Sequence, residues 1–225
     1  MTLRTPLVTG EWYHCCNRGT DKRTVFKSAA DYERFIALLF TSNGTRSVQL
    51  SDLNGGDPMS VFDKDIVRGD QLVDIAVYTL MPNHAHLVVR QMADNGLALF
   101  MQKLFTGYTM YFNRKYERSG ALFQGSFRSR HIDSDEYLKQ VIPYVLLNPV
   151  ELFEKRWKSG FGNERKIAEQ LRAYPYSSLP LFFGEKRPEK KLLGDSIYEY
   201  YDKVPSLESM LHSARAYYAE ISPLF

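Results

Sequence analysis

Two apolar segments joined by a short corner, QLVDIAVYTL-MPN-HAHLVVR, limit most strongly what this chain can fold into. Residues 71–80 have the apolar composition of a buried strand, and residues 84–90 predict a second one. Pro82 and Asn83 between them are typical of a tight turn, which sends the second strand back along the first. The sequence therefore predicts an antiparallel hairpin that carries two histidines at the head of its second strand.

The segments on either side of this hairpin alternate between strand and helix patterns. Ser28 and Ser134 are placed to cap helices, with Asp31 at the third position of the first helix. Strand-like patterns mark residues 11–18 and 120–132, and helical spacing of apolar residues marks residues 28–39, 97–116 and 135–147. This order of strand, helix, strand pair, helix, strand and helix predicts an α+β fold in which helices cover an antiparallel sheet.

Two intervals lack such a pattern. Residues 41–69 are rich in turn-forming pairs and predict a loop, with a short hairpin within residues 47–62 as the alternative. After about residue 157 the pattern loosens into a proline-containing tail. Because 225 residues that are 44% hydrophobic can bury one good core, we expect a main domain over residues 1–160 and an extension over residues 161–225 that packs on or beside it.

Composition narrows the cellular setting. No stretch approaches the roughly 20 consecutive apolar residues of a membrane helix. The N-terminal segment lacks an apolar run after Arg4, so we expect no secretory signal. Cys15 and Cys16 are adjacent and do not form an ordinary bridge across a loop. We therefore expect a cytoplasmic, reducing setting without contact to a membrane.

Positive charge is concentrated in one region, although the net charge is only +3. Residues 113–130 contain one acid, Glu117, and five basic residues: Arg114, Lys115, Arg118, Arg128 and Arg130. These alternate with Tyr111, Phe112, Tyr116, Phe123 and Phe127. Basic residues interleaved with aromatic ones are typical of a nucleic-acid surface. A charged surface that serves only solubility is the alternative.

His84 and His86 stand two residues apart on a predicted strand. Their side chains therefore point to one face, about 6.5 Å apart along the strand, and two imidazoles so placed can hold a divalent metal. Tyr144 and Asn148 are four residues apart and share a helical face, which offers an amide oxygen as a third ligand. This mixture suits Mn²⁺ and tolerates Mg²⁺. Two satisfied structural histidines are the alternative, and His14 and His131 are interpreted as structural or solvent-facing.

Six motifs together resemble one protein family. They are EWYHCCNRG at 11–19, SAADYERFIALL at 28–39, YTLMPNHAHLVVR at 78–90, LFTGYTMYFNRKYERSGALFQGSFRS at 104–129, DEYLKQVIPYVLLNPV at 135–150 and AYPYSSL at 173–179. In this order they resemble the HUH-class single-tyrosine transposases, and among these the REP-associated tyrosine transposases. The resemblance covers most of residues 11–180.

The resemblance implies a ferredoxin-like, RNA-recognition-like sheet and a role for each matching residue. Tyr144 would be the nucleophile that cleaves and rejoins single-stranded DNA next to REP-like palindromic hairpins, through a 5′-phosphotyrosine. His84, His86 and Asn148 would hold Mg²⁺ or Mn²⁺. DNA would contact Asn17, Arg18, Arg114, Lys115, Arg118, Arg128 and Arg130. The assembly would be a monomer or a homodimer.

The sequence departs from the family pattern at three positions. Ala85 is smaller than the usual middle residue of the histidine pair, Ser126 replaces an expected basic residue, and Pro143 should kink the helix just before Tyr144. A hairpin-binding protein with little or no cleavage is therefore an alternative function, and a small-molecule metallohydrolase is a third. Tyr137, on nearly the same face, is the second candidate nucleophile.

Overall fold

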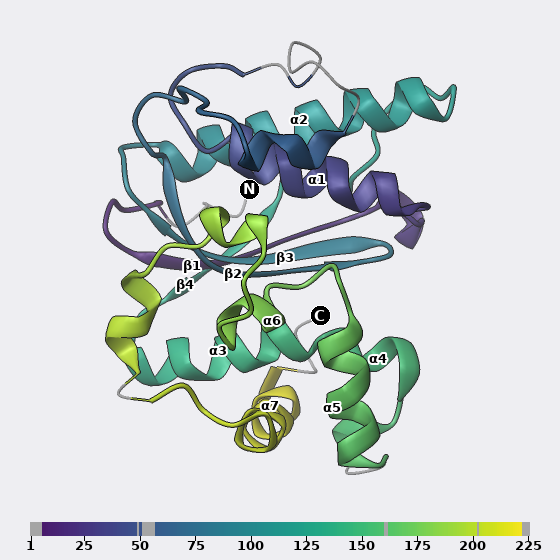
Figure 1. Cartoon of the computed structure of the whole chain (residues 1–225), viewed down its shortest axis with the longest axis vertical. Helices are drawn as coiled ribbons and strands as arrows, with labels where there is room; N and C mark the ends of the chain where they lie inside the picture. Colours follow the sequence, from purple (N-terminus) through teal and green to yellow (C-terminus); the bar gives the residue numbers. More distant parts are fainter. Residues whose placement is uncertain (1–5, 49, 51–56, 160–161, 202, 222–225) are drawn as a thin grey trace.

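The predicted hairpin forms one side of a four-stranded antiparallel sheet (Figure 1). The computed structural model describes residues 6–48, 50, 57–159, 162–201 and 203–221. Strand β2 (Val73–Met81) pairs with β3 (His84–Gln91), and Met81 lies opposite His84 at the turn. β3 pairs in turn with β1 (Trp12–Arg18), and β4 (Arg128–Ile132) completes the order β2-β3-β1-β4.

Two helices connect these strands in the ferredoxin-like order. Helix α1 (Ala29–Thr41) joins β1 to β2, and α2 (Gly96–Lys115) joins β3 to β4. The element order β-α-β-β-α-β with this strand order is the ferredoxin-like arrangement, so the predicted α+β fold is confirmed. Helix α3 (Asp135–Leu147) follows β4, and Ser134 caps it as predicted, since its Oγ accepts from the Tyr137 backbone N–H at 3.2 Å.

Helices cover both faces of the sheet (Figure 1). On one face, α1 and α2 pack over inward-pointing residues that include Tyr13, Cys15 and Leu87. On the other face, α3 packs over Trp12 and Val88. Side chains alternate along each strand, so each face has its own hydrophobic core. Polar residues on the second face therefore lie under α3 rather than in solvent.

The strand predicted over residues 120–132 begins only at Arg128, so that prediction was wrong for its first half. Gly120 and Gly125 adopt φ values of 82° and 75°, which break an extended chain. The segment is instead a loop that inserts apolar side chains into the core between α1, α2 and the sheet. Phe123 and Phe127 belong to that core, which explains why their spacing resembled a strand.

The residues after about 157, where the sequence pattern loosens, form helices in the structure. The C-terminal segment folds against α3 and shares its core through buried side chains such as Leu171, Phe182 and Met210. Its helices are α4 (Val150–Phe153), α5 (Glu164–Ala173), α6 (Leu179–Phe182) and α7 (Leu207–Ile221) (Figure 1). Short 3₁₀ turns occupy Thr20–Lys22, Pro58–Phe62, Trp157–Ser159, Pro188–Leu192 and Ser196–Tyr200.

The C-terminal segment also forms hydrogen bonds with backbone groups at the outer edge of the sheet, on strand β2. The backbone N–H of Leu80 donates to the Tyr176 carbonyl at 2.9 Å, and that of Ser178 donates to the Tyr78 carbonyl at 2.9 Å. Paired groups at an edge strand remove a template for association with another chain. This pairing explains why all nine residues of the edge strand β2 are buried.

The interval predicted as a loop, residues 41–69, includes the 3₁₀ turn Pro58–Phe62. The alternative, a hairpin within residues 47–62, includes residues 49 and 51–56, which lie outside the described residues. Within the part of the chain that the structure describes, none of the helices is long and apolar enough to cross a membrane.

Candidate functional site

A cavity of about 420 Å³ opens on the sheet face that α3 covers. It lies where β1 and β3 meet at the turn end of the hairpin, next to the loop that precedes β4. Seven of its lining residues are predicted site residues: Asn17, Arg18, His84, His86, Arg128, Tyr144 and Asn148. The other six are Cys16, Lys22, Gln124, Ser126, Glu151 and Lys158.

Strand register brings the polar side chains of this cavity together. Cys16 lies opposite His86 and Arg18 lies opposite His84 across the β1–β3 pair. Arg128 on β4 lies opposite Cys16 on its other side. Because directly paired residues point to the same face, these five side chains form one layer of the cavity wall. Helix α3 supplies the facing layer.

Each of the two predicted metal-ligating histidines has a neighbour at its Nδ1 atom. Nδ1 of His84 lies 2.6 Å from Oδ1 of Asn83, and Nδ1 of His86 lies 2.9 Å from Nε2 of His14. The rings of His84 and His86 have centroids 4.8 Å apart and planes at 81°. The pair is therefore held in place by contacts that do not use Nε2.

His14 is a residue whose place the sequence interpretation missed. It is only 3% exposed, stacks on His86 at a centroid distance of 5.1 Å, and meets the ring of Tyr144 edge-on at 5.5 Å. His14 is therefore not solvent-facing, and its neighbours are those of the candidate site. The period of two along β1 places His14 on the face of Cys16 and Arg18, and this signal was present in the sequence.

Burial keeps all three histidines of this cluster neutral near pH 7. Burial, and after it the nearby Arg18, lower the pKa of His84 to about 3. The pKa of His14 is lowered to about 4 by burial and by Arg130. The pKa of His86 lies well below its usual value, because of burial first and then its neighbours His84, His14 and Arg18. A neutral imidazole is the form that binds metals.

Tyr144 and Asn148 stand on the α3 side of the cavity, one turn apart. The Asn148 side-chain amide donates to the Tyr144 carbonyl at 3.0 Å. The ring of Tyr144 is 6% exposed and meets His86 edge-on at 5.8 Å. Burial raises the pKa of Tyr144, Cys16 and Glu151 raise it further, and Arg18 opposes the rise. Helix α3 continues through Pro143, and the predicted kink there stays a prediction.

The cavity carries an excess of positive charge. Four basic side chains line it, Arg18, Lys22, Arg128 and Lys158, against one acid, Glu151. Lys158 forms an ion pair with Glu151. With neutral histidines, these groups leave a surplus of three positive charges at the wall. A cavity lined by one sign of charge attracts ligands of the other sign, so this one favours an anion.

Four of the predicted DNA-contacting residues lie outside this cavity: Arg114, Lys115, Arg118 and Arg130. Arg118 donates to Asn113 Oδ1 at 2.5 Å and to the Ala121 carbonyl at 3.2 Å, so it braces the turn after α2. The Arg130 guanidinium lies over the Tyr137 ring at 4.9 Å. Tyr137, the second candidate nucleophile, is not among the lining residues. Their roles in DNA binding or chemistry stay predictions.

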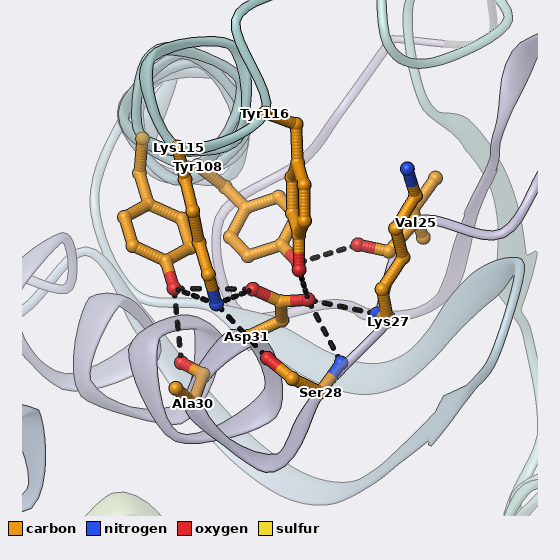
Figure 2. Close-up of polar contacts among 9 residues, drawn as sticks. Val25, Lys27, Ser28, Ala30, Asp31, Tyr108, Lys115 and Tyr116 are labelled. Carbon is orange, nitrogen blue, oxygen red and sulfur yellow. Dashed lines mark hydrogen bonds and ion pairs between the residues drawn. The ribbon is translucent and has the colours of Figure 1, made fainter.

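Lys115 instead belongs to a second polar cluster, which we call the Asp31 cluster (Asp31, Lys115, Tyr111, Tyr116 and the backbone of Lys27 and Ser28). Figure 2 shows Lys115 and Tyr116 reaching from the end of α2 to Asp31 at the start of α1. Lys115 Nζ contacts Asp31 Oδ1 at 2.7 Å, Tyr111 Oη at 3.0 Å and Ser28 Oγ at 2.9 Å. These contacts use its three protons and favour a structural role.

Two imidazoles and the Asn148 amide are the predicted metal donors among the residues that line the cavity. Across the described residues, no three His, Cys, Asp or Glu side chains gather as a metal site. A metal at His84 and His86 therefore needs another kind of ligand, and Asn148 lines the same cavity. An amide oxygen beside two imidazoles, with water or phosphate oxygens completing the shell, suits Mn²⁺ and tolerates Mg²⁺. The donor set fits the predicted cofactor.

Comparisons with known proteins give only distant similarities. No protein-family model matches the chain, and no curated protein matches it. The chain is similar to a solved structure of a REP-associated tyrosine transposase bound to a REP hairpin, with 11% identity, a TM-score of 0.49, and 92% of this chain and 93% of that chain covered. It is also similar to tRNA(His) guanylyltransferase from Saccharomyces cerevisiae, with 9% identity, a TM-score of 0.32, and coverage of 91% and 85%.

Proposed function

We propose that this protein is a metal-dependent strand-transfer enzyme that cleaves and rejoins single-stranded DNA beside a hairpin, with Tyr144 as the nucleophile. One observation carries the proposal: Tyr144, His84, His86 and Asn148 line a single cavity that also has a surplus of positive charge. A phenol, donors for a divalent metal and an anion-attracting wall are what the transfer of a phosphodiester to a side chain requires. The hairpin as target rests on the sequence resemblance alone.

In the proposed step, Oη of Tyr144 forms a bond to the phosphorus of a DNA phosphodiester. The bond between that phosphorus and the 3′ oxygen breaks, the phenol proton passes to water, and the 3′ oxygen takes up a proton. The products are a 3′-hydroxyl and a 5′-phosphotyrosine. One phosphoester replaces another, so the reverse step rejoins the strand without a nucleotide triphosphate.

The chain's own residues prepare Tyr144 and the phosphate for this step. His84, His86 and Asn148 would hold the divalent ion, which when bound acts as a Lewis acid on the phosphate oxygens. Arg18 opposes the rise that burial causes in the pKa of Tyr144, so it stabilises the phenolate as it forms. Arg18 and Arg128 on the cavity wall would contact the phosphates, which gives salt-dependent affinity without reading the base sequence.

A hairpin-binding protein that does not cleave is the second candidate, and a specific observation favours it. Tyr144 is only 6% exposed and its pKa is raised, so the phenol must be reached and activated before it can attack. Ser126 on the cavity wall also supplies no charge where the family has a basic residue. A small-molecule metallohydrolase is less well supported, because the described residues offer no third His or Asp ligand beside His84 and His86.

The test is to capture the covalent intermediate. The full chain is incubated with Mn²⁺ or Mg²⁺ and with end-labelled single-stranded hairpin DNA from its own genomic neighbourhood, and the products are separated on a denaturing gel. We expect a metal-dependent protein–DNA band that Tyr144→Phe removes. Tyr137→Phe is the matched control, because it makes the same change two turns earlier on α3 and outside the cavity; it should leave the band intact.

Other outcomes separate the alternatives. A hairpin that shifts on a native gel but never forms the band favours the binding protein. A band that persists in Tyr144→Phe and disappears in Tyr137→Phe would transfer the role of nucleophile to Tyr137. Neither band nor shift, with any of the hairpins, would contradict both DNA functions.

A further inference from the structure

The two cavity histidines are each held at Nδ1 by a side chain that the sequence resemblance does not assign. We propose that Asn83 and His14 are positioning residues that fix the tautomers of His84 and His86, so that both rings present an unprotonated Nε2 to a divalent metal. This inference rests on the proposed function, because it concerns the metal that the two histidines would hold.

The orientation of Asn83 fixes the tautomer of His84. The Asn83 side-chain N–H donates to the Lys22 carbonyl at 3.2 Å, which identifies the other amide atom, 2.6 Å from His84 Nδ1, as the oxygen. A flipped amide would place two oxygens against each other at the Lys22 carbonyl. An amide oxygen only accepts, so the proton of the neutral His84 ring lies on Nδ1. Its Nε2 therefore keeps a lone pair for a ligand.

His14 plays the same part for His86 from the neighbouring strand. His14 Nε2 and His86 Nδ1 are 2.9 Å apart, and the two residues are 3% and 4% exposed, so water competes little for this bond. One of the two nitrogens carries the proton. When His86 gives its Nε2 lone pair to a metal, its proton must lie on Nδ1 and His14 Nε2 must accept it. The stacked rings, with planes 19° apart, also fix the plane of His86.

Partners of this kind affect metal affinity without touching the metal. A hydrogen bond from the remote ring N–H of a ligating histidine fixes its tautomer and orientation, and removal of the partner typically costs about 10-fold to 100-fold in metal affinity. Asn83 and His14 come from the two ends of the site, one from the β2–β3 turn and one from β1. Each histidine is thus positioned independently, and losses in the two variants should multiply.

The tautomers are measured first, in the metal-free wild-type protein, by long-range ¹H–¹⁵N NMR of the imidazole rings. In the metal-free protein we expect a protonated Nδ1 and an unprotonated Nε2 at His84, and a single proton between His86 Nδ1 and His14 Nε2. A proton on Nε2 of His84 would overturn the inference. This measurement requires neither a variant that folds nor any enzymatic activity.

Metal affinity is then measured by Mn²⁺ binding, followed by electron paramagnetic resonance, in two matched pairs of variants. His14→Phe keeps the stacked ring without the acceptor, while His14→Gln restores an acceptor without the ring. Asn83→Ala removes the amide oxygen, while Asn83→Asp keeps an acceptor. We expect about 10-fold to 100-fold weaker binding in His14→Phe and Asn83→Ala, and recovery to within a few-fold of wild type in the other two.

The outcomes distinguish this inference from the proposed function. Wild-type affinity in folded His14→Phe and Asn83→Ala would overturn the positioning role. A wild type with the expected tautomers that binds no Mn²⁺ would reject the metal in the proposed function, and with it the purpose assigned here to the tautomers. A wild type that binds Mn²⁺ tightly and shows the acceptor-dependent pattern, but forms no DNA adduct, would support the positioning role and reject only the cleavage.

Discussion

Two polar clusters lie on opposite faces of the sheet, and they differ in how their charges are satisfied. In the Asp31 cluster, a fully buried carboxylate accepts from the backbone of Lys27 and Ser28, from two tyrosine hydroxyls and from Lys115 (Figure 2). In the cavity beneath α3, four basic residues and one acid surround open space. The first cluster is complete within the protein, whereas the second has an excess of positive charge that favours an anion from outside.

This contrast shows how the same residue types serve different ends. Burial by itself would raise the pKa of Asp31, but hydrogen bonds from Lys115, Tyr116, Lys27 and Tyr111 lower it overall. Its negative charge is thus stabilised by partners that also join α1 to the end of α2. The cavity histidines are instead kept neutral, which keeps their lone pairs available. One cluster stabilises the fold, and the other is proposed to do chemistry.

The largest expected effect is a loss of DNA-cleaving activity when the cavity beneath α3 is changed. His86→Ala should reduce metal-dependent adduct formation by about 10³-fold, because a Lewis acid on the phosphate contributes several kcal/mol to the transition state. The rate of adduct formation on labelled hairpin DNA measures this. His131→Ala is the matched control: His131 contacts Glu11 at 2.8 Å, outside the cavity, and its loss should change the rate little. Equal losses in the two variants would contradict the metal role of His86.

The second effect is a loss of stability when the Asp31 cluster is changed. Asp31→Ala should lower the free energy of unfolding by about 3 kcal/mol, because the buried pair with Lys115 is broken and several donors lose their acceptor. Urea unfolding followed by circular dichroism measures this. The exposed carboxylate of Asp133 offers a control, since Asp133→Ala should change stability by less than about 0.5 kcal/mol. The hairpin affinity of the folded Asp31→Ala protein should match wild type, and a loss there would mean that the Asp31 cluster also serves DNA.

Much of the fold was predictable because its signals are local. Three signals each determine the structure of only the few residues around them. They are the hairpin corner at Pro82 and Asn83, the position of Asp31 in α1, and the helix cap of Ser134. The first half of the strand predicted over residues 120–132 failed because apolar side chains in a loop give the same pattern as a strand. The sequence did not predict the C-terminal helices, because their apolar residues are buried by contact with α3, which is distant in sequence.

The site was predictable to the extent that it follows from periodicity. The spacing of His84 and His86 and the helical turn from Tyr144 to Asn148 fix which faces these residues occupy, and the fold then brings the faces together. Periodicity could not show that Arg128 lines the cavity while Lys115 belongs to the Asp31 cluster. Both are basic residues near aromatic ones, and only the packing of α2 on α1 gives Lys115 a carboxylate partner.

The third effect concerns the salt dependence of hairpin binding at the cavity. Arg18→Ala and Arg128→Ala should each weaken hairpin binding about 10-fold and reduce the slope of log affinity against log salt by about 1, as expected when one phosphate contact is lost. Arg165→Ala, at an exposed position on α5 outside the cavity, should change neither. Binding measured at several salt concentrations decides this. If Arg114→Ala, at a residue predicted to contact DNA, reduces the slope and Arg18→Ala does not, DNA lies along α2 rather than across the cavity.

The smallest effect is a pH dependence confined to the Asp31 cluster. The pKa of Asp31 is lowered in the folded protein, so its stabilising contribution is fully present above the pKa of the unfolded chain, about 4. It is lost as pH falls from there through the folded pKa, with a slope of at most about 1.4 kcal/mol per pH unit. The difference in unfolding free energy between wild type and Asp31→Asn should therefore stay constant from pH 7 to about 5 and shrink below about 4. Parallel curves down to acid pH would show that the pKa of Asp31 is the same in the folded and unfolded chain, which would contradict the lowered pKa.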